Sequence, residues 1–221
     1  MEMRQLMQSL DVAWLESTLM RVAAILLCLT VHETCHGLAA LALGDPTARA
    51  RHRLSLNPLR HIDWLGLAMM LTVGFGWARP VPVDPRYFRN PKRGMAVTAL
   101  AGPVSNFLLA FLAMAVCPVV YPFIASDTSA AYRLFIFCRL YLAPLSIGLG
   151  IFNLLPIPPL DGSKVLGAFL PERTYFGLMR YERCGMLLLL ALSWLGVTGN
   201  LIREAVAQAD WAMWSLVMQF A

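Results

Sequence analysis

Long stretches of this sequence contain no charged residue, and this feature limits the chain to a few kinds of fold. Of the 221 residues, 58% are hydrophobic and only 14% are charged, and the mean hydropathy is +0.62. An ordinary soluble domain carries about 25% charged residues. Because a helix of roughly 20 apolar residues can cross a bilayer, we expect an all-α polytopic membrane protein. The length leaves room for a single membrane-embedded domain over residues 1–221.

The apolar stretches predict four membrane spans and one shorter element. The predicted spans lie at about residues 12–43, 94–124, 133–156 and 185–206. The first span ends at Gly44-Asp45-Pro46, where glycine can cap a helix and proline cannot continue it. Trp64–Trp77 is uncharged but only fourteen residues long, which is too short to cross as a helix. Residues 207–221 could form an interfacial helix or a fraying tail.

The positive charges are concentrated around the short apolar element. Nine of the eighteen Lys and Arg residues fall between Arg49 and Arg93, and they form a basic loop on each side of it. This clustering is typical of loops on the cytoplasmic side, so it explains the net charge of +5 without a nucleic-acid partner. We therefore expect a re-entrant, irregular or hairpin-like segment at about residues 64–77, and a lipid bilayer around the spans.

His32-Glu33-Thr34-Cys35-His36 places a metal-binding pattern inside the first span. Residues four apart share one face of a helix, so His32 and His36 can bind one Zn²⁺ while Glu33 beside them acts as a general base. His36 lies eight residues before Gly44, or about 12 Å from the cytoplasmic end of the helix. Ionisable groups at that depth are costly, which favours a functional site reached by a water-filled cavity.

Two histidines need a third ligand to make a catalytic zinc site. His52 and His61 lie in the basic loops, where the attraction for a cation is weakest. Asp161 follows a proline-rich stretch that breaks the helix, so an unwound chain can carry its carboxylate back toward the metal. Two histidines, one carboxylate and a water form a known catalytic zinc set. The sequence therefore predicts one Zn²⁺ per chain, bound by His32, His36 and Asp161.

Four sequence elements, in order, resemble the site-2 proteases, a family of intramembrane zinc metallopeptidases. They are His32–Gly37, the lead-in Asn57–Gly66, the element Ala101–Asn106 and the stretch Asn153–Gly162. The resemblance implies a three-helix catalytic core whose zinc is held by the two histidines and the aspartate. We expect an integral protein of a bacterial plasma membrane. The basic loops after the first span put the active site nearer the cytoplasmic side. The chain resembles a compact form, because no segment of it could be a PDZ or CBS domain.

The predicted reaction is hydrolysis of peptide bonds in membrane proteins that have a single span. Glu33 would take a proton from the zinc-bound water and return it to the leaving amine. Asn153 is the candidate donor to the oxyanion, and Asn106 is a second candidate for that role or for binding substrate. The region Leu65–Trp77 could present a strand edge to which a substrate is added as a further strand.

A metal-binding membrane protein without proteolysis is the alternative, either a transporter or a scaffold that binds single-span partners. Transport favours several liganding groups along successive helices, whereas this sequence has one cluster. It also retains Glu33, which neither alternative requires.

Overall fold

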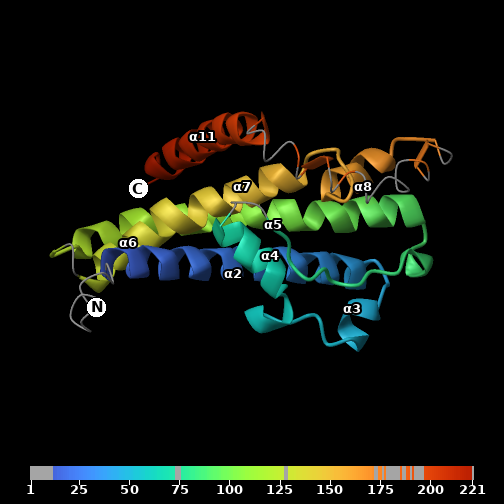
Figure 1. Ribbon diagram of the computed structural model, residues 1–221, viewed down its shortest axis with the longest axis horizontal. Coiled ribbons are helices and arrows are strands. Elements are labelled where there is room, and N and C mark those ends of the chain that lie inside the picture. Colours follow the sequence, from blue (N-terminus) through green and yellow to red (C-terminus); the bar gives the residue numbers. More distant parts are fainter. Residues whose placement is uncertain are drawn as a thin grey trace, which may run out of the picture.

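Three long helical rods form the centre of the molecule (Figure 1). The computed structural model describes residues 12–72, 76–126, 129–171 and 197–220, together with positions 174, 175, 177, 185, 188, 189 and 191. The first two rods are α2 (Val12–Ala42) and α5 (Pro91–Val120). The third is continuous from α6 (Ala130–Ile136) through a π-helical turn (Phe137–Leu142) into α7 (Ala143–Asn153). The described residues contain no strand, which confirms the all-α fold and the three-helix core.

The three rods are long and apolar enough to span a membrane. The qualifying stretches are Trp14–Ala42, Pro91–Phe123 and Ala130–Asn153. Their shared core is built largely from small side chains, among them Ala24 and Cys28 of α2 and Ala110 and Ala113 of α5. Small residues let helix backbones approach closely, which is the usual basis of helix packing in lipid. The protein is therefore an integral membrane protein.

Local signals set the ends of these helices. Gly44 has a φ of +101°, and the Asp45 N–H donates to the Ala40 carbonyl at 2.9 Å, so the glycine caps α2 where the sequence predicts a stop. Asn90 begins α5, because its side-chain oxygen accepts the Arg93 N–H and Pro91 occupies the first turn. These hydrogen bonds matter because a backbone polar group without a partner is costly in lipid.

The C-terminal helix α11 (Val197–Met218) packs along α7 and α5 on the outside of the bundle (Figure 1). Arg139 of the π-helical turn donates to both carboxylate oxygens of Asp210 at 2.8 and 3.0 Å and lies 4.8 Å from the Trp214 ring centroid. This contact ties α11 to the third rod. Of the two alternatives for residues 207–221, the fraying tail is wrong, because helix continues to Met218. Most of the first half of the predicted span 185–206 lies outside the described residues, so the fourth span stays a prediction.

The predicted re-entrant segment has more regular structure than the sequence suggests. Its first part is a helix, α4 (Trp64–Thr72), so the expectation of an irregular element or a strand edge at Leu65–Trp77 is wrong for those residues. Leu67 of α4 packs against Ile25 and Leu29 of α2. A helix of nine residues is marginal by itself, and this packing stabilises it. The chain then returns as an extended segment over residues 76–84.

Two glycines bring α4 and the returning chain into backbone contact. A methyl group on Gly66 would overlap the Trp77 carbonyl, and one on Gly76 would overlap the Gly66 carbonyl. We predict that Gly66→Ala lowers the free energy of unfolding by about 1–3 kcal/mol, because the extended segment must move away from α4. Thermal unfolding in detergent micelles measures this effect. Gly148→Ala is the control, since its methyl group would lie 3.8 Å from Val206, and an unchanged midpoint for Gly66→Ala would contradict the contact.

Candidate metal centre

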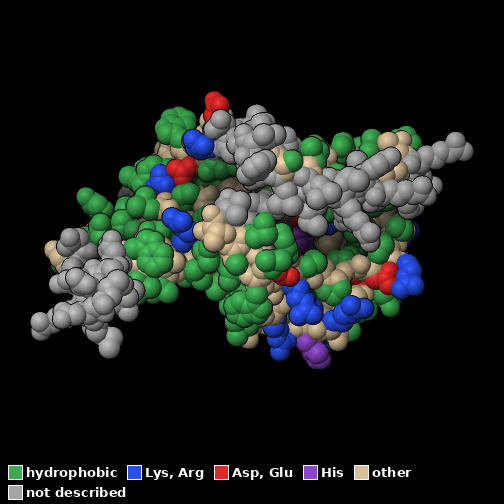
Figure 2. Space-filling view, in the orientation of Figure 1, with side chains coloured by type: hydrophobic (Ala, Val, Ile, Leu, Met, Phe, Trp, Pro, Cys, Tyr) green, Lys and Arg blue, Asp and Glu red, His purple; other side chains and the backbone are tan. Residues whose placement is uncertain are grey.

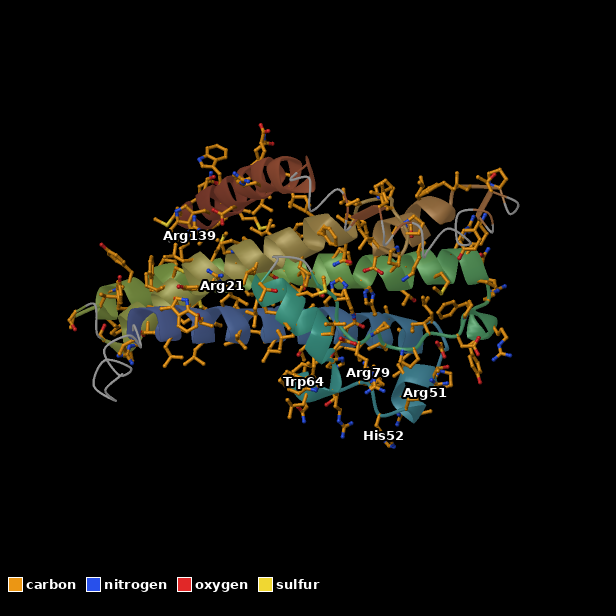
Figure 3. All side chains as sticks on the ribbon, in the orientation of Figure 1. Arg21, Arg51, His52, Trp64, Arg79 and Arg139 are labelled. Atoms are coloured by element: carbon orange, nitrogen blue, oxygen red, sulfur yellow. The ribbon has the colours of Figure 1, made fainter. Side chains whose placement is uncertain are left out.

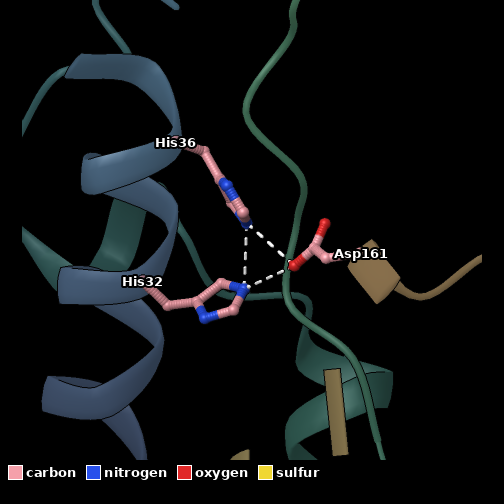
Figure 4. Close-up of side chains that lie close together, drawn as sticks. All are labelled: His32, His36 and Asp161. Carbon is pink, nitrogen blue, oxygen red and sulfur yellow. Dashed lines mark hydrogen bonds and ion pairs between the residues drawn. The ribbon is translucent and has the colours of Figure 1, made fainter. Parts of the chain in front are cut away.

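The side chains of His32, His36 and Asp161 converge on one point (Figure 4). The two His Nε2 atoms are 2.9 Å apart, and Asp161 Oδ2 lies 3.2 Å from His32 Nε2 and 3.1 Å from His36 Nε2. Within the part of the chain that the structure describes, these are the residues that form a His, Cys, Asp or Glu group able to hold a metal ion. The structure thus brings together all three predicted ligands.

Each ligand is placed by the local structure of its own element. His32 and His36 are one helical turn apart on α2 and point the same way. Asp161 is the first residue of α8 (Asp161–Gly167), directly after the proline-rich turn. A methyl group on Gly162 would overlap the Leu154 carbonyl, so this glycine lets α8 begin against the end of α7. The glycine is needed for close approach of two backbone segments.

The geometry of the three atoms fits a zinc ion. Ligands about 2.0–2.1 Å from zinc in a tetrahedron lie roughly 3.3 Å apart, and the observed separations of 2.9, 3.1 and 3.2 Å are close to that value. His36 Nδ1 lies 2.7 Å from the Thr98 carbonyl, to which it must donate, so in the neutral ring the Nε2 lone pair is available to a metal. Imidazole, imidazole and carboxylate with one open position is a catalytic donor set.

The ligands are shielded from solvent. His32, His36 and Asp161 are only 4%, 9% and 6% exposed. Lys164 of α8 contacts Asp161 Oδ1 at 3.4 Å. Burial by itself raises the pKa of the Asp161 carboxyl, but hydrogen bonds with His32 and His36 and the charge of Lys164 outweigh it and hold the pKa below its usual range. Asp161 is therefore ionised, as a metal ligand must be.

Glu33 faces the same cavity as the three ligands. Its Oε2 accepts the Val81 N–H at 2.7 Å, so the extended segment 76–84 fixes the carboxylate. The cavity has a volume of about 980 Å³ and is walled by α2, α4, α5, α7, α8, α11 and the extended segment. In Figure 2 the histidine colour is visible at the floor of a hollow on this face. Glu33 and the three ligands thus line one cavity inside an apolar bundle, with room for many water molecules.

The other two histidines lie away from this centre. His52 points out of the bundle beside Arg51, beyond the α3 turn (Thr47–Ala50; Figure 3). His61 is 1% exposed, and its Nε2 lies 2.7 Å from the Ser55 carbonyl within the basic loop. Neither belongs to the metal group, in agreement with the sequence prediction.

The two candidate asparagines lie in different places. Asn153 lines the cavity at the end of α7, where its side-chain N–H donates to the Leu149 carbonyl at 2.9 Å. Asn106 is fully buried, and its amide nitrogen lies 3.1 Å from His32 Nδ1. Asn106 thus contacts His32 on the ring nitrogen that is not in the metal group, whereas Asn153 lies at the cavity wall. Their predicted roles stay predictions.

Sequence reasoning missed several residues that shape the centre. Lys164 could have been found, because it lies three residues after Asp161 and α8 is helical. The Thr98 carbonyl and the Val81 N–H left no signal, because backbone groups have no sequence identity. Gly102 is the third case. A methyl group there would lie 2.5 Å from His36 Nε2 and 2.6 Å from His32 Cε1, so its close contact is with the ligands themselves.

Comparison with known proteins agrees with this geometry. The family model described as Peptidase family M50 matches residues 119–195. The proposed zinc metalloprotease YwhC of Bacillus subtilis (strain 168) is 35% identical over 173 residues, which are 77% of this chain and 78% of YwhC. No solved structure matches the chain.

Two mycobacterial relatives are more distant. The proposed zinc metalloprotease Rip2 of Mycobacterium tuberculosis (strain H37Rv) is 30% identical over 179 residues, 78% of this chain and 66% of Rip2. Rip2 of Mycolicibacterium smegmatis is 28% identical over 179 residues, 77% of this chain and 65% of that protein. The chain therefore spans about two thirds of the length of the Rip2 proteins and a larger share of YwhC.

Proposed function

Because the chain belongs to Peptidase family M50, we propose that this zinc metalloprotease is an intramembrane endopeptidase of the site-2 protease type. One observation carries the proposal. His32, His36, Asp161 and Glu33 line a single cavity within a bundle of helices that are long and apolar enough to span a membrane.

The proposed chemistry divides between the metal and Glu33. His32, His36 and Asp161 would hold a zinc ion, which would supply polarisation of the substrate carbonyl and a lower pKa for the attacking water. Glu33 takes a proton from the attacking water and returns it to the leaving amine. The Val81 N–H holds the Glu33 carboxylate at 2.7 Å, which restricts its rotation during that transfer. Asn153, at the cavity wall, is the candidate donor to the developing oxyanion.

The proposed substrates are membrane proteins with a single span, received beside the extended segment 76–84. A helical substrate must unwind before its peptide bonds can be attacked. Three backbone N–H groups of this segment already donate hydrogen bonds. The Arg79 N–H donates to the His61 carbonyl. The N–H groups of Val81 and Asp84 donate to the carboxylates of Glu33 and Asp45. Prolines at positions 80 and 82 have no N–H. An added substrate strand would therefore be bound there mainly through the carbonyl groups of the segment.

We place the active site nearer the cytoplasmic side of a bacterial plasma membrane. His36 lies six residues before the end of α2, and the basic loops follow that end. Figure 2 shows Lys and Arg side chains gathered over this part of the surface. Positive loops favour the cytoplasmic side. Labelling of a single cysteine placed at Arg89 tests the orientation, and access only from outside the cell would contradict it.

Removal of zinc tests the proposed function. Membrane proteins that co-purify with a Glu33→Gln variant supply candidate substrates, and each is then reconstituted in lipid vesicles with the wild-type protein. We expect cleavage fragments that disappear when a zinc chelator is added and return with excess Zn²⁺. Zinc binding without any chelator-sensitive cleavage would instead favour the metal-binding scaffold. Transport is less favoured, because the described residues hold one metal group and not a series along the helices.

A further inference from the structure

The amide of Asn106 meets His32 on the side of the ring that faces away from the metal group. Asn106 is 0% exposed, on α5, and its amide nitrogen lies 3.1 Å from His32 Nδ1. Its Oδ1 is buried and has no hydrogen-bond partner among the residues that the structure describes. The contact with His32 is therefore the one that decides which amide atom, oxygen or nitrogen, faces the ring.

The chemistry of a metal ligand decides that orientation. If His32 offers the Nε2 lone pair to a metal, its proton is on Nδ1, and Nδ1 is then a donor. An amide NH₂ is also a donor, so with its nitrogen toward Nδ1–H the Asn106 amide would repel the ring. The oxygen and nitrogen of an amide have nearly the same shape, and which one faces a neighbour is assigned from its hydrogen bonds. A half-turn of the amide puts Oδ1 opposite Nδ1–H.

The second histidine shows the same arrangement on the same helix. His36 Nδ1 lies 2.7 Å from the carbonyl oxygen of Thr98, eight residues before Asn106 on α5. Gly102, midway between them, has no side chain, and this lets both rings approach the helix. One face of α5 therefore meets both imidazoles at intervals of four residues, and Asn106 is the residue on this face whose side chain lies within hydrogen-bond distance of His32 Nδ1.

We propose that Asn106 is a positioning residue, which accepts the Nδ1–H of His32 through Oδ1 and so keeps Nε2 free and directed at zinc. The proposal rests on the zinc site of the proposed function, and it assigns Asn106 a role distinct from contact with substrate. Groups that orient metal-bound histidines in this way commonly raise metal affinity by roughly 10- to 100-fold. Loss of the Asn106 acceptor should therefore lower zinc affinity directly, and cleavage only as a consequence.

A series of three variants tests the role through zinc affinity, measured by competition with a chromophoric chelator in detergent. Asn106→Leu keeps the shape and removes the acceptor, and we expect zinc binding to weaken by roughly 10- to 100-fold. Asn106→Asp keeps an acceptor and has no donor, so its affinity should stay within about threefold of wild type or exceed it. Ser105→Ala is the control, because the Ser105 hydroxyl donates to the Gly102 carbonyl within α5, and it should bind zinc as wild type does.

The absorption spectrum of the Co²⁺-loaded protein adds a readout that does not depend on activity. Asn106→Leu should change the ligand-field bands, because the His32 ring is no longer held, while Asn106→Asp should retain them. If Asn106→Asp and Asn106→Leu weaken zinc equally, or if Leu binds as wild type does, the positioning role is wrong. Those results would leave the proposed proteolysis standing, whereas a wild-type protein that binds no zinc would overturn both proposals.

Discussion

Glu33→Gln is expected to abolish measurable peptide hydrolysis while zinc stays bound. Glutamine has the size of glutamate, and its side-chain oxygen can accept the Val81 N–H that now binds Glu33 Oε2, so the extended segment keeps its place. What is lost is the ability to take a proton from water, and a general base commonly contributes about 10²- to 10⁴-fold in rate. Initial rates of cleavage in vesicles, together with the zinc content of the same samples, measure both effects.

Glu33→Asp is the matched control for this change. Aspartate retains a carboxylate but is shorter by one methylene, so it should lose the Val81 contact and show an intermediate rate. If Glu33→Gln cleaves as fast as the wild type, Glu33 is not the base. If it loses zinc, the carboxylate serves the metal site and the assigned role is wrong. Full zinc content with no cleavage is the result that supports the mechanism.

The parts of this structure that depend on local spacing could be predicted from the sequence. His32 and His36 are four residues apart, and a helix puts such residues on one face whatever surrounds it. The long uncharged stretches predict the three central rods, because in lipid each backbone polar group needs a partner within its own helix. Asp161 could also be predicted from local sequence, because the prolines before it break the helix and let the chain turn back.

The parts that depend on contacts between distant residues could not be predicted. Asn106 and His32 are 74 residues apart, and Glu33 and Val81 are 48 apart. No periodicity or propensity joins such pairs. The helical form of α4 was missed because its nine residues are stabilised by packing against α2 and α7, and a window of sequence does not show that packing. The ion pair between Arg139 and Asp210 is a further case, because the two residues are 71 positions apart and neither one alone indicates its partner.

Gly102→Ala is expected to remove zinc from a protein that still folds. The added methyl group would lie 2.5 Å from His36 Cε1 and Nε2 and 2.6 Å from His32 Cε1, so both rings must move. Metal sites tolerate ligand displacements of only about 0.2 Å, and we expect zinc affinity to fall by roughly 100-fold or more, with cleavage lost in parallel. Chelator competition and the zinc content after purification measure the loss.

Stability of the metal-free protein separates this effect from general damage to the bundle. Alanine is favoured over glycine inside a helix by about 1 kcal/mol. The atoms that the added methyl group would meet belong to two side chains and not to backbone, so without a metal the rings can shift to make room. The metal-free Gly102→Ala protein should therefore melt no lower than metal-free wild type. Gly148→Ala is the control, since it adds the same group to another helix at the cavity wall, 3.8 Å from Val206, and should bind zinc normally. A Gly102→Ala protein with wild-type zinc affinity would show that the rings do not need this space. The other contrary result is a lower melting temperature without metal, which would make the glycine a packing residue of α2 and α5.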